Sequence, residues 1–426
     1  MYKKQAALLC MCITLLCVRE AAAEETVFAE EISGPAATEA AAAGDSITKI
    51  EIIGLKRTKE HIALYPLERF RGTSARDLDE NEVKAVIMDT GILDPVSVEV
   101  LIGDDGAVLR VTVTEKWSII PLPLFSVQGS SYAGGIFLAD TNAFGLRDQA
   151  VIGGMYGSSN WMLMSMYNHV SSGNLPGWTV SFGYTRGERK DLDSEETVLR
   201  RFKEQNLMAG GSINYSLARY ITAAFGVTYG QSKILETKNL LAAPDDARFL
   251  EFAPRISVRT SKYDGYLMSE KRASLSYEYH WGIKGDSFGS VRFDGQFQHS
   301  LYPGFLVSVQ SGALWSPDAP DLFESGPEAS RTGLLPAGYR AQSYAGFSAG
   351  LEKYLLKFKI GTLSALAAWQ TVVSKGPLSD TEAAYGPIGG IRFYLSRIAI
   401  PGLSFAIGYN IKTGIKQFSF NMGVSL

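Results

Sequence analysis

The side chains best suited to chemistry are few and scattered in this sequence. Its four histidines, His61, His169, His280 and His299, lie far apart and have no second ligand at metal-site spacing. The sequence contains neither a G-x-S-x-G nucleophile turn nor a glycine-rich phosphate loop. It therefore predicts no catalytic residue, no metal site and no cofactor, and it favours a protein that is not an enzyme.

The elements that would have to position any site are alternating strands. Residues 273–281 (ASLSYEYHW) place apolar or aromatic side chains at odd positions and small or polar ones at even positions. Residues 178–185, 291–298 and 405–410 repeat this pattern. Successive side chains of a strand point to opposite faces, so one face suits lipid and the other suits water. With about sixteen such strands, residues 117–426 are predicted to form a transmembrane antiparallel β-barrel around a wet lumen.

The lengths of the predicted connections alternate. If residues 118–128 run outward from the periplasm, the long connections at 188–205, 231–248, 317–340 and 374–385 all lie outside the cell. The short ones near 144–146, 172–176, 218–220, 301–304 and 398–401 then face the periplasm. Short periplasmic turns and long outer loops are the rule for such barrels. The charged segment 188–204 is accordingly expected to be a solvated outer loop.

The N-terminus predicts export. Lys3 and Lys4 precede an apolar run over residues 6–18, and three alanines at 21–23 offer a cleavage site, so residues 1–23 are interpreted as a signal peptide. All three cysteines lie inside it, which leaves the exported chain without disulfides. Residues 24–45 are interpreted as a flexible linker. The formal charge of −3 gives no indication of a nucleic-acid partner. These features predict a bacterial outer-membrane protein.

Residues 46–116 read as a separate α+β domain. The expected order is β-α-α-β-β: a strand over residues 47–52, helices over 59–70 and 75–88, and a hairpin of strands 96–101 and 107–114. Gly91 is expected to end the second helix in a left-handed conformation.

The domain resembles a POTRA domain, the periplasmic module of the BamA/TamA outer-membrane assembly superfamily. Three segments match the pattern of this domain: its opening strand at residues 50–54 (IEIIG), its helix exit at 90–96 (TGILDPV) and its closing strand at 113–117 (VTEKW). The later segment resembles the surface-antigen barrel of the same superfamily. Asp140, Asn142 and Gly145 match the D-x-N-x-x-G motif of an early hairpin, and residues 338–342 and 350–354 resemble the sixth surface loop and the strand that follows it.

The resemblance implies that Arg340, beside Tyr339, folds inward from the long loop and locks it to carboxylates on the barrel wall. A guanidinium can hold such a loop through paired hydrogen bonds that a lysine cannot reproduce. Glu352 and Glu278 have the strand parity to supply the acid. The alternative is that Arg340 is an ordinary surface-loop arginine.

Pro121 and Pro123 lie in the expected first barrel strand, where each removes a backbone donor from the same edge. They predict a weak seam against the last strand, residues 416–426, which contains Phe418 and Phe420. Alternatively, they stiffen the hinge between the two domains.

Three functions remain open. The favoured one is an assembly factor that captures unfolded outer-membrane clients by strand addition to the POTRA domain and inserts them through the seam. Periplasmic chaperones or lipoproteins would be further partners, and outer-membrane lipid would surround the barrel. The second is a pore that secretes one dedicated partner. The third is a surface-exposed structural or adhesive barrel. The POTRA domain could also be only a periplasmic spacer.

Overall fold

The structure is a computed structural model. It describes residues 45–422 except 89, 104–105, 129–130, 171–174, 219, 239–243, 265–266, 325–332, 337, 360, 376–380 and 396–402. The predicted signal peptide and nearly all of the predicted linker lie outside the described residues, as do the last four residues of the chain.

Residues 46–116 form a small α+β unit, here called the N-terminal domain. Its elements are β1 (Ile47–Ile53), α2 (Glu60–Leu64), the 3₁₀ helix η1 (Tyr65–Phe70), α3 (Glu80–Met88), β2 (Leu93–Gly103) and β3 (Gly106–Glu115). The sheet has the order β1-β3-β2, with β1 parallel to β3 and β2 antiparallel to it. Its buried core joins Ile50 and Leu109 of the sheet to Leu67 and Ile87 of the helices. The assignment of this unit as a POTRA domain stays a prediction.

Two local details differ from the predicted helices. The first helix changes to a 3₁₀ helix at Tyr65, because Pro66 has no N–H to continue the α-helical bonds. The second begins only at Glu80, where the Asp79 carboxylate caps it by accepting a hydrogen bond from the Asn81 N–H at 2.8 Å. Gly91 has a φ of 75°, as expected for a residue that terminates a helix.

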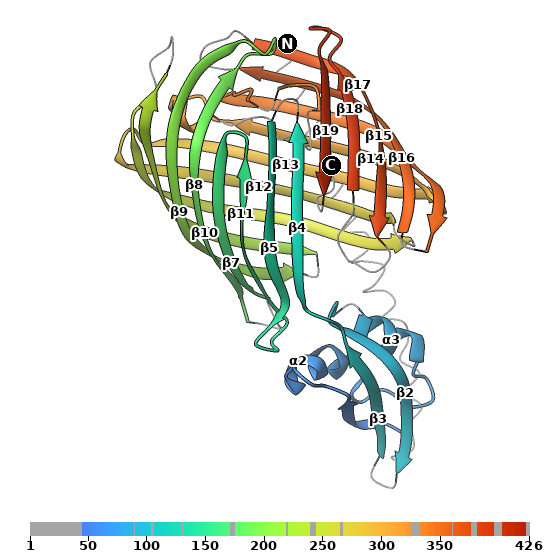
Figure 1. Cartoon of the computed structure of the whole chain (residues 1–426). Coiled ribbons are helices and arrows are strands. Elements are labelled where there is room, and N and C mark those ends of the chain that lie inside the picture. Colours follow the sequence, from blue (N-terminus) through green and yellow to red (C-terminus); the bar gives the residue numbers. More distant parts are fainter. Residues whose placement is uncertain are drawn as a thin grey trace.

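Sixteen antiparallel strands form a closed barrel beside this domain (Figure 1), which confirms the predicted fold class. They are β4 (Ile119–Gln128), β5 (Ser131–Ala143), β6 (Asp148–Gly157), β7 (Asn160–His169), β8 (Gly177–Leu192), β9 (Val198–Ala218), β10 (Ile221–Thr237), β11 (Ala247–Asp264), β12 (Leu267–Lys284), β13 (Phe288–Tyr302), β14 (Phe305–Trp315), β15 (Ser343–Phe358), β16 (Gly361–Lys375), β17 (Thr381–Leu395), β18 (Leu403–Tyr409) and β19 (Lys416–Met422).

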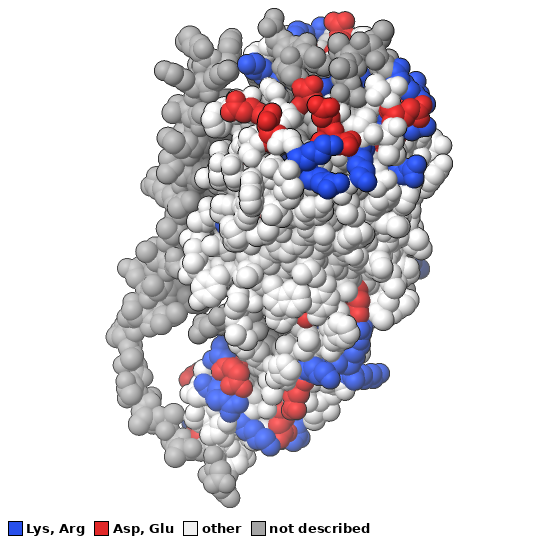
Figure 2. All heavy atoms as spheres, turned by 90° about the vertical axis from the view of Figure 1, so that its left-hand side faces the viewer, with Lys and Arg blue, Asp and Glu red and all other residues white. Residues whose placement is uncertain are grey.

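The barrel wall alternates as the sequence predicts. On β12, Leu275 and Trp281 are 48% and 53% exposed, whereas Ser276 and His280 face inward and are 4% and 8% exposed. Figure 2 shows the consequence for one face of the outer surface: an uncharged band across the barrel, with lysine, arginine and acidic side chains gathered above and below it. Such a band suits the hydrocarbon core of a membrane. No helix in the described part of the chain is long and apolar enough to cross a membrane.

The connections also differ from the prediction in detail. Much of the segment 188–205 is not a loop, because β8 continues to Leu192 and β9 begins at Val198. Cross-strand pairing holds these ends together, with Glu188 opposite Lys203 and beside Arg201. As a result β8–β12 have 15 or more residues each, whereas β6 and β7 have 10.

Candidate functional site

The early hairpin motif lies at the junction of the two domains. The Asn142 amide donates a hydrogen bond to Thr58 Oγ1 at 2.9 Å, and the Gly145 carbonyl accepts one from the Lys59 N–H at 2.8 Å. Gly145 has a φ of 75°, and a Cβ at this position would lie 2.1 Å from the Arg57 carbonyl oxygen. Only glycine allows this close approach. The motif therefore attaches the N-terminal domain to the turn between β5 and β6.

A bidentate ion pair supports the same junction. The Arg57 guanidinium donates to both carboxylate oxygens of Asp140, at 3.1 and 2.5 Å, and to Ser118 Oγ at 2.7 Å. Glu115 fixes the segment that carries Arg57 by accepting bonds from three successive backbone N–H groups, residues 56–58. Burial alone would raise the pKa of Glu115, but these N–H donors outweigh it and lower the pKa below its ordinary value.

Replacing Arg57 by alanine should loosen the junction without unfolding either domain. The pair is partly exposed, so we expect a loss of about 1 kcal/mol, roughly fivefold in the ratio of docked to undocked domain. Spin-label distances between the N-terminal domain and the barrel should broaden. Arg69→Ala is the matched control, since its partner Glu82 belongs to the same domain. Equal broadening in both variants would contradict this role for Arg57.

The connection from residue 316 to residue 342, here called the lumenal loop, enters the barrel. Its residues Leu334, Leu335, Tyr339 and Ala341 are buried against inward side chains of β16–β18: Val372, Ala384, Ile388 and Ala406. The Gly333 N–H donates to the Gln370 side chain at 3.0 Å. The described parts of this loop therefore lie against the inner wall.

Tyr339 and Arg340 connect this loop to two sides of the lumen. The Tyr339 hydroxyl lies 2.8 Å from Ser374 Oγ on β16. The backbone of Tyr339 forms a bridge with Leu192 at the end of β8, and Arg340 Nε lies 3.7 Å from Asp191 on the same strand. The arginine thus points inward, toward a carboxylate that sequence reasoning did not single out. Its role as a lock stays a prediction.

Asp191 is the centre of a buried ionic cluster. Its carboxylate lies 2.7 Å from Arg189 Nε and 3.0 Å from Arg200 Nε. Arg200, 1% exposed, also contacts two acids of the lumenal loop, Asp321 at 2.6 Å and Glu324 at 2.7 Å. The expectation that residues 188–204 are only a solvated loop is thus wrong for Asp191, Arg200 and Phe202, which are buried. The sequence signal that could have indicated an inward face is Phe202, an apolar residue between Arg201 and Lys203, which is buried in the structure.

Glu324 makes the docking of the lumenal loop sensitive to pH. It lies in the connection outside the strands, and burial raises its pKa to about 7, with Arg200 opposing and the acids Asp321 and Asp191 reinforcing the shift. A carboxyl whose pKa is raised on docking takes up a proton, so docking is favoured as pH falls through 7 and weakens as pH rises. The gain in docking stability is complete near pH 4.5, the ordinary pKa of a glutamate side chain.

Hydrogen exchange of residues 316–323 and 338–342 should therefore be slower at pH 5.5 than at pH 7.5, after correction for intrinsic rates. Glu324→Gln mimics the protonated form and should remove most of this difference while keeping the loop docked. An unchanged pH dependence in the variant would exclude Glu324 as the titrating group.

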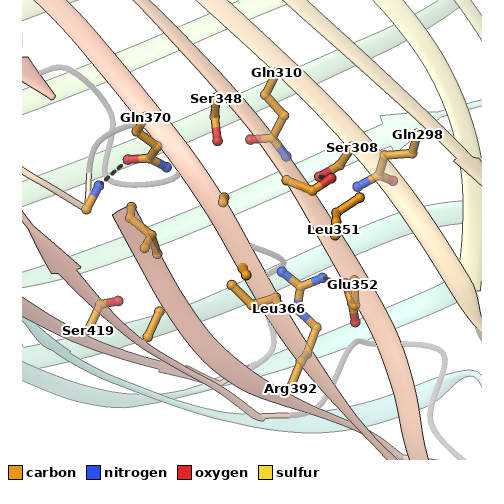
Figure 3. A pocket seen from close by; sticks show the side chains of 16 residues that line it. Gln298, Ser308, Gln310, Ser348, Leu351, Glu352, Leu366, Gln370, Arg392 and Ser419 are labelled. Atoms are coloured by element: carbon orange, nitrogen blue, oxygen red, sulfur yellow. Dashed lines mark hydrogen bonds and ion pairs between the residues drawn. The ribbon is translucent and has the colours of Figure 1, made fainter. Parts of the chain in front are cut away.

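The structure does not bring Glu352 near Arg340. Glu352 is farther down β15 and faces β17, where it accepts hydrogen bonds from Arg392 and from the Tyr394 hydroxyl, both at 2.7 Å. Glu278, the other acid considered, contacts Arg292 on β13 at 3.3 Å. Figure 3 shows Glu352 and Arg392 pointing toward each other in a small pocket on the inner wall, which is also lined by the side chains of Gln298, Gln310, Ser348, Gln370 and Ser419.

This pocket has a cavity volume of about 70 Å³. That is room for a few water molecules. The amide and hydroxyl lining suits hydration, as expected for the water-facing side of a barrel.

The seam joins β4 to β19. Within the described residues only three pairs connect the two strands: Gln128 with Ser419, Val127 with Phe420, and Ser126 with Asn421. By contrast, β4 pairs with β5 along its whole length, including Pro121 and Pro123. The Phe420 ring lies 6.1 Å from that of Phe125 across the seam, whereas Phe418 contacts Phe405 on β18. The prolines lie closer to the start of β4 than these three pairs.

The band, the closed antiparallel sheet and the polar inner wall define an outer-membrane type of β-barrel. The chain is similar to BamA from Haemophilus ducreyi lacking POTRA domains 1–3, with 13% identity over 89% of this chain and 84% of that chain and a TM-score of 0.58. It is also similar to CdiB from Acinetobacter baumannii (12% identity, 89% and 74% covered, TM-score 0.62) and from Escherichia coli (14%, 89% and 76%, 0.63). No protein-family model and no curated protein sequence matches it. The fold is that of the BamA and CdiB barrels.

Proposed function

We propose that this protein is an outer-membrane assembly factor that inserts unfolded β-barrel clients at the seam between β4 and β19. The observation that carries the proposal is that Pro121 and Pro123 remove two backbone donors from β4, one of the two strands that border the seam. A ladder with fewer donors is weaker, so an incoming strand can replace part of it with little loss of existing bonds.

The N-terminal domain has a role consistent with client capture on the periplasmic side. In the part of the chain that the structure describes, its sheet order gives β2 a single neighbour and leaves its other edge without a paired strand. Val96 and Ile102 on β2 are 62% and 66% exposed. An extended client could add to this edge through main-chain bonds, with exposed apolar side chains beside it. Because Arg57 of this domain contacts Asp140, a captured client would lie near the hairpin that continues from β4.

A second candidate is a dedicated protein-secretion pore of the same fold. The polar inner wall around Gln298, Gln310 and Gln370 favours it, because an extended chain in transit needs hydrogen-bonding partners. In this case the lumenal loop would have to leave the lumen.

Depletion of the protein separates these functions. An assembly factor predicts that many outer-membrane barrels decline together in the membrane proteome. A secretion pore predicts the loss of one secreted protein with normal barrels. If neither changes, both proposals fail and a structural or adhesive barrel remains.

A further inference from the structure

Lysine and arginine side chains line the outer surface of β8–β12 at the rim opposite the N-terminal domain. Figure 2 shows blue side chains directly above the uncharged band on this side of the barrel. The set, here called the basic rim, comprises Lys190, Arg201, Lys203, Lys233, Lys238, Arg248 and Lys284. It lies far from the N-terminal domain because β8 and β10 run away from the periplasmic turns and end there.

The alternation of the strands places Arg201, Lys203 and Arg248 on the outer surface, and Lys284 pairs with Arg248 beyond a register shift. Arg200 and Phe202 are buried inside the barrel, so Arg201 and Lys203 between and beside them point to the outer surface. On β11 the same holds for Arg248, whose neighbours Ala247 and Phe249 are buried inside. The basic rim is thus on the membrane side of the wall, separate from the ionic cluster around Asp191.

The cations outnumber the carboxylates that pair with them. Glu188 contacts Arg201, Glu236 lies 2.6 Å from Lys203, and Asp246 lies 3.1 Å from Lys284. Within the strands, the six cations other than Lys238 minus the two carboxylates of Glu188 and Glu236 leave +4, and Lys238 and Asp246 lie just beyond the strand ends. Asp245 and Asp286 belong to connections beyond the strand ends, as do the acids of residues 193–196. Exposed ion pairs of this kind are weak, so another anion can displace the carboxylates.

The basic rim lies at the height of the lipid headgroups. Lys203 is 15 residues from Ala218, the periplasmic end of β9. At ~3.4 Å per residue and a tilt of ~45°, this is a height of about 35 Å, against ~30 Å for the hydrocarbon core. Just below Arg248 and Lys284, the outer wall turns apolar, with the paired side chains Leu250–Trp281 and Phe252–Tyr279.

We propose that the basic rim binds the phosphate groups of an anionic glycolipid in the outer leaflet of the membrane. A phosphate monoester carries about −1.5 to −2 charges at pH 7 and three acceptor oxygens, which matches a row of ammonium and guanidinium donors. The apolar wall beneath supplies the surface for the acyl chains of the same molecule. The proposal requires only that the basic rim lies at the outer leaflet, and it is independent of client insertion.

The test measures binding of diphosphorylated lipid A to the purified full-length protein in detergent, by native mass spectrometry. Lys203→Gln/Lys238→Gln should weaken binding about tenfold. The matched control, Lys353→Gln/Lys357→Gln, removes two exposed cations near the periplasmic end of β15 and should leave binding unchanged. Lipid A stripped of its phosphates should bind wild-type protein about as weakly as diphosphorylated lipid A binds the rim variant.

Inorganic phosphate at millimolar concentration should not displace the lipid. Equal affinities of the rim and control variants would overturn the proposal, as would undiminished binding of the dephosphorylated lipid. Displacement by inorganic phosphate would show a site for free anions and overturn the assignment to lipid. A heat-dependent gel shift verifies that each variant is folded, and client insertion is measured separately.

Discussion

A disulfide between Gln128→Cys and Ser419→Cys is expected to abolish client insertion and to leave the barrel itself intact. These two residues face each other across the seam, within the few described pairs that hold β4 to β19. Directly opposed residues of an antiparallel pair lie within the Cα separation that a disulfide spans. The covalent bond would prevent the strands from separating, which the proposed insertion requires. Insertion of a reporter barrel into proteoliposomes measures the effect, and a reductant should restore it.

The matched control is a disulfide between Ala313→Cys and Ala345→Cys, which face each other across β14 and β15, away from the seam. The three natural cysteines lie in the predicted signal peptide, so a chain without it contains only the introduced pair. Normal insertion by the oxidised seam variant would show that β4 and β19 stay joined during function. Equal inhibition by the control would point to general stiffening of the barrel.

Replacing Arg200 by methionine should release the lumenal loop. The change leaves the acids Asp191 and Glu324 in a buried site without their shared guanidinium. Removing one partner of a buried ion pair typically costs about 3–5 kcal/mol. We expect faster hydrogen exchange in residues 338–342 and a larger single-channel conductance in planar bilayers, since the described parts of the loop occupy the lumen.

Arg201→Met is the control for this experiment, because Arg201 is the neighbouring arginine of the same strand and faces the opposite side. It should keep the wild-type conductance and exchange. If Arg200→Met also behaves like the wild type, the ionic cluster does not hold the loop, and the apolar contacts of Tyr339 and Leu334 hold it alone.

The barrel could be predicted from the sequence because its pattern is local. The outward positions of β12 alternate within nine residues, and each strand repeats the signal independently. The early hairpin motif could also be recognised in the sequence, but the residues that it contacts could not. Arg57 is 83 residues from Asp140 in the chain, and no local pattern links them.

The ionic cluster could not be predicted for a related reason. Asp191 and Arg200 lie in a segment whose many charges resemble a solvated loop, and Glu324 is 124 residues from Arg200. The two sides of β8 and β9 carry different charge systems: Glu188 and Arg201 face outward, and Asp191 and Arg200 face inward. The outward and inward charges can be told apart only from the structure, in which both strands extend past the expected loop boundary and Phe202 is buried.

The unequal lengths of the strands also affect the surrounding lipid. With 10 residues each, β6 and β7 have a vertical reach of about 24 Å at ~3.4 Å per residue and ~45° tilt, whereas the 21 residues of β9 reach about 50 Å. A bilayer must thin beside the shorter wall to avoid exposing its hydrocarbon, at a modest elastic cost for each ångström of mismatch. These short strands continue from β4 and β5, so the thinned patch adjoins the seam. An arriving strand would have to cross a thinner bilayer there than beside β8–β12.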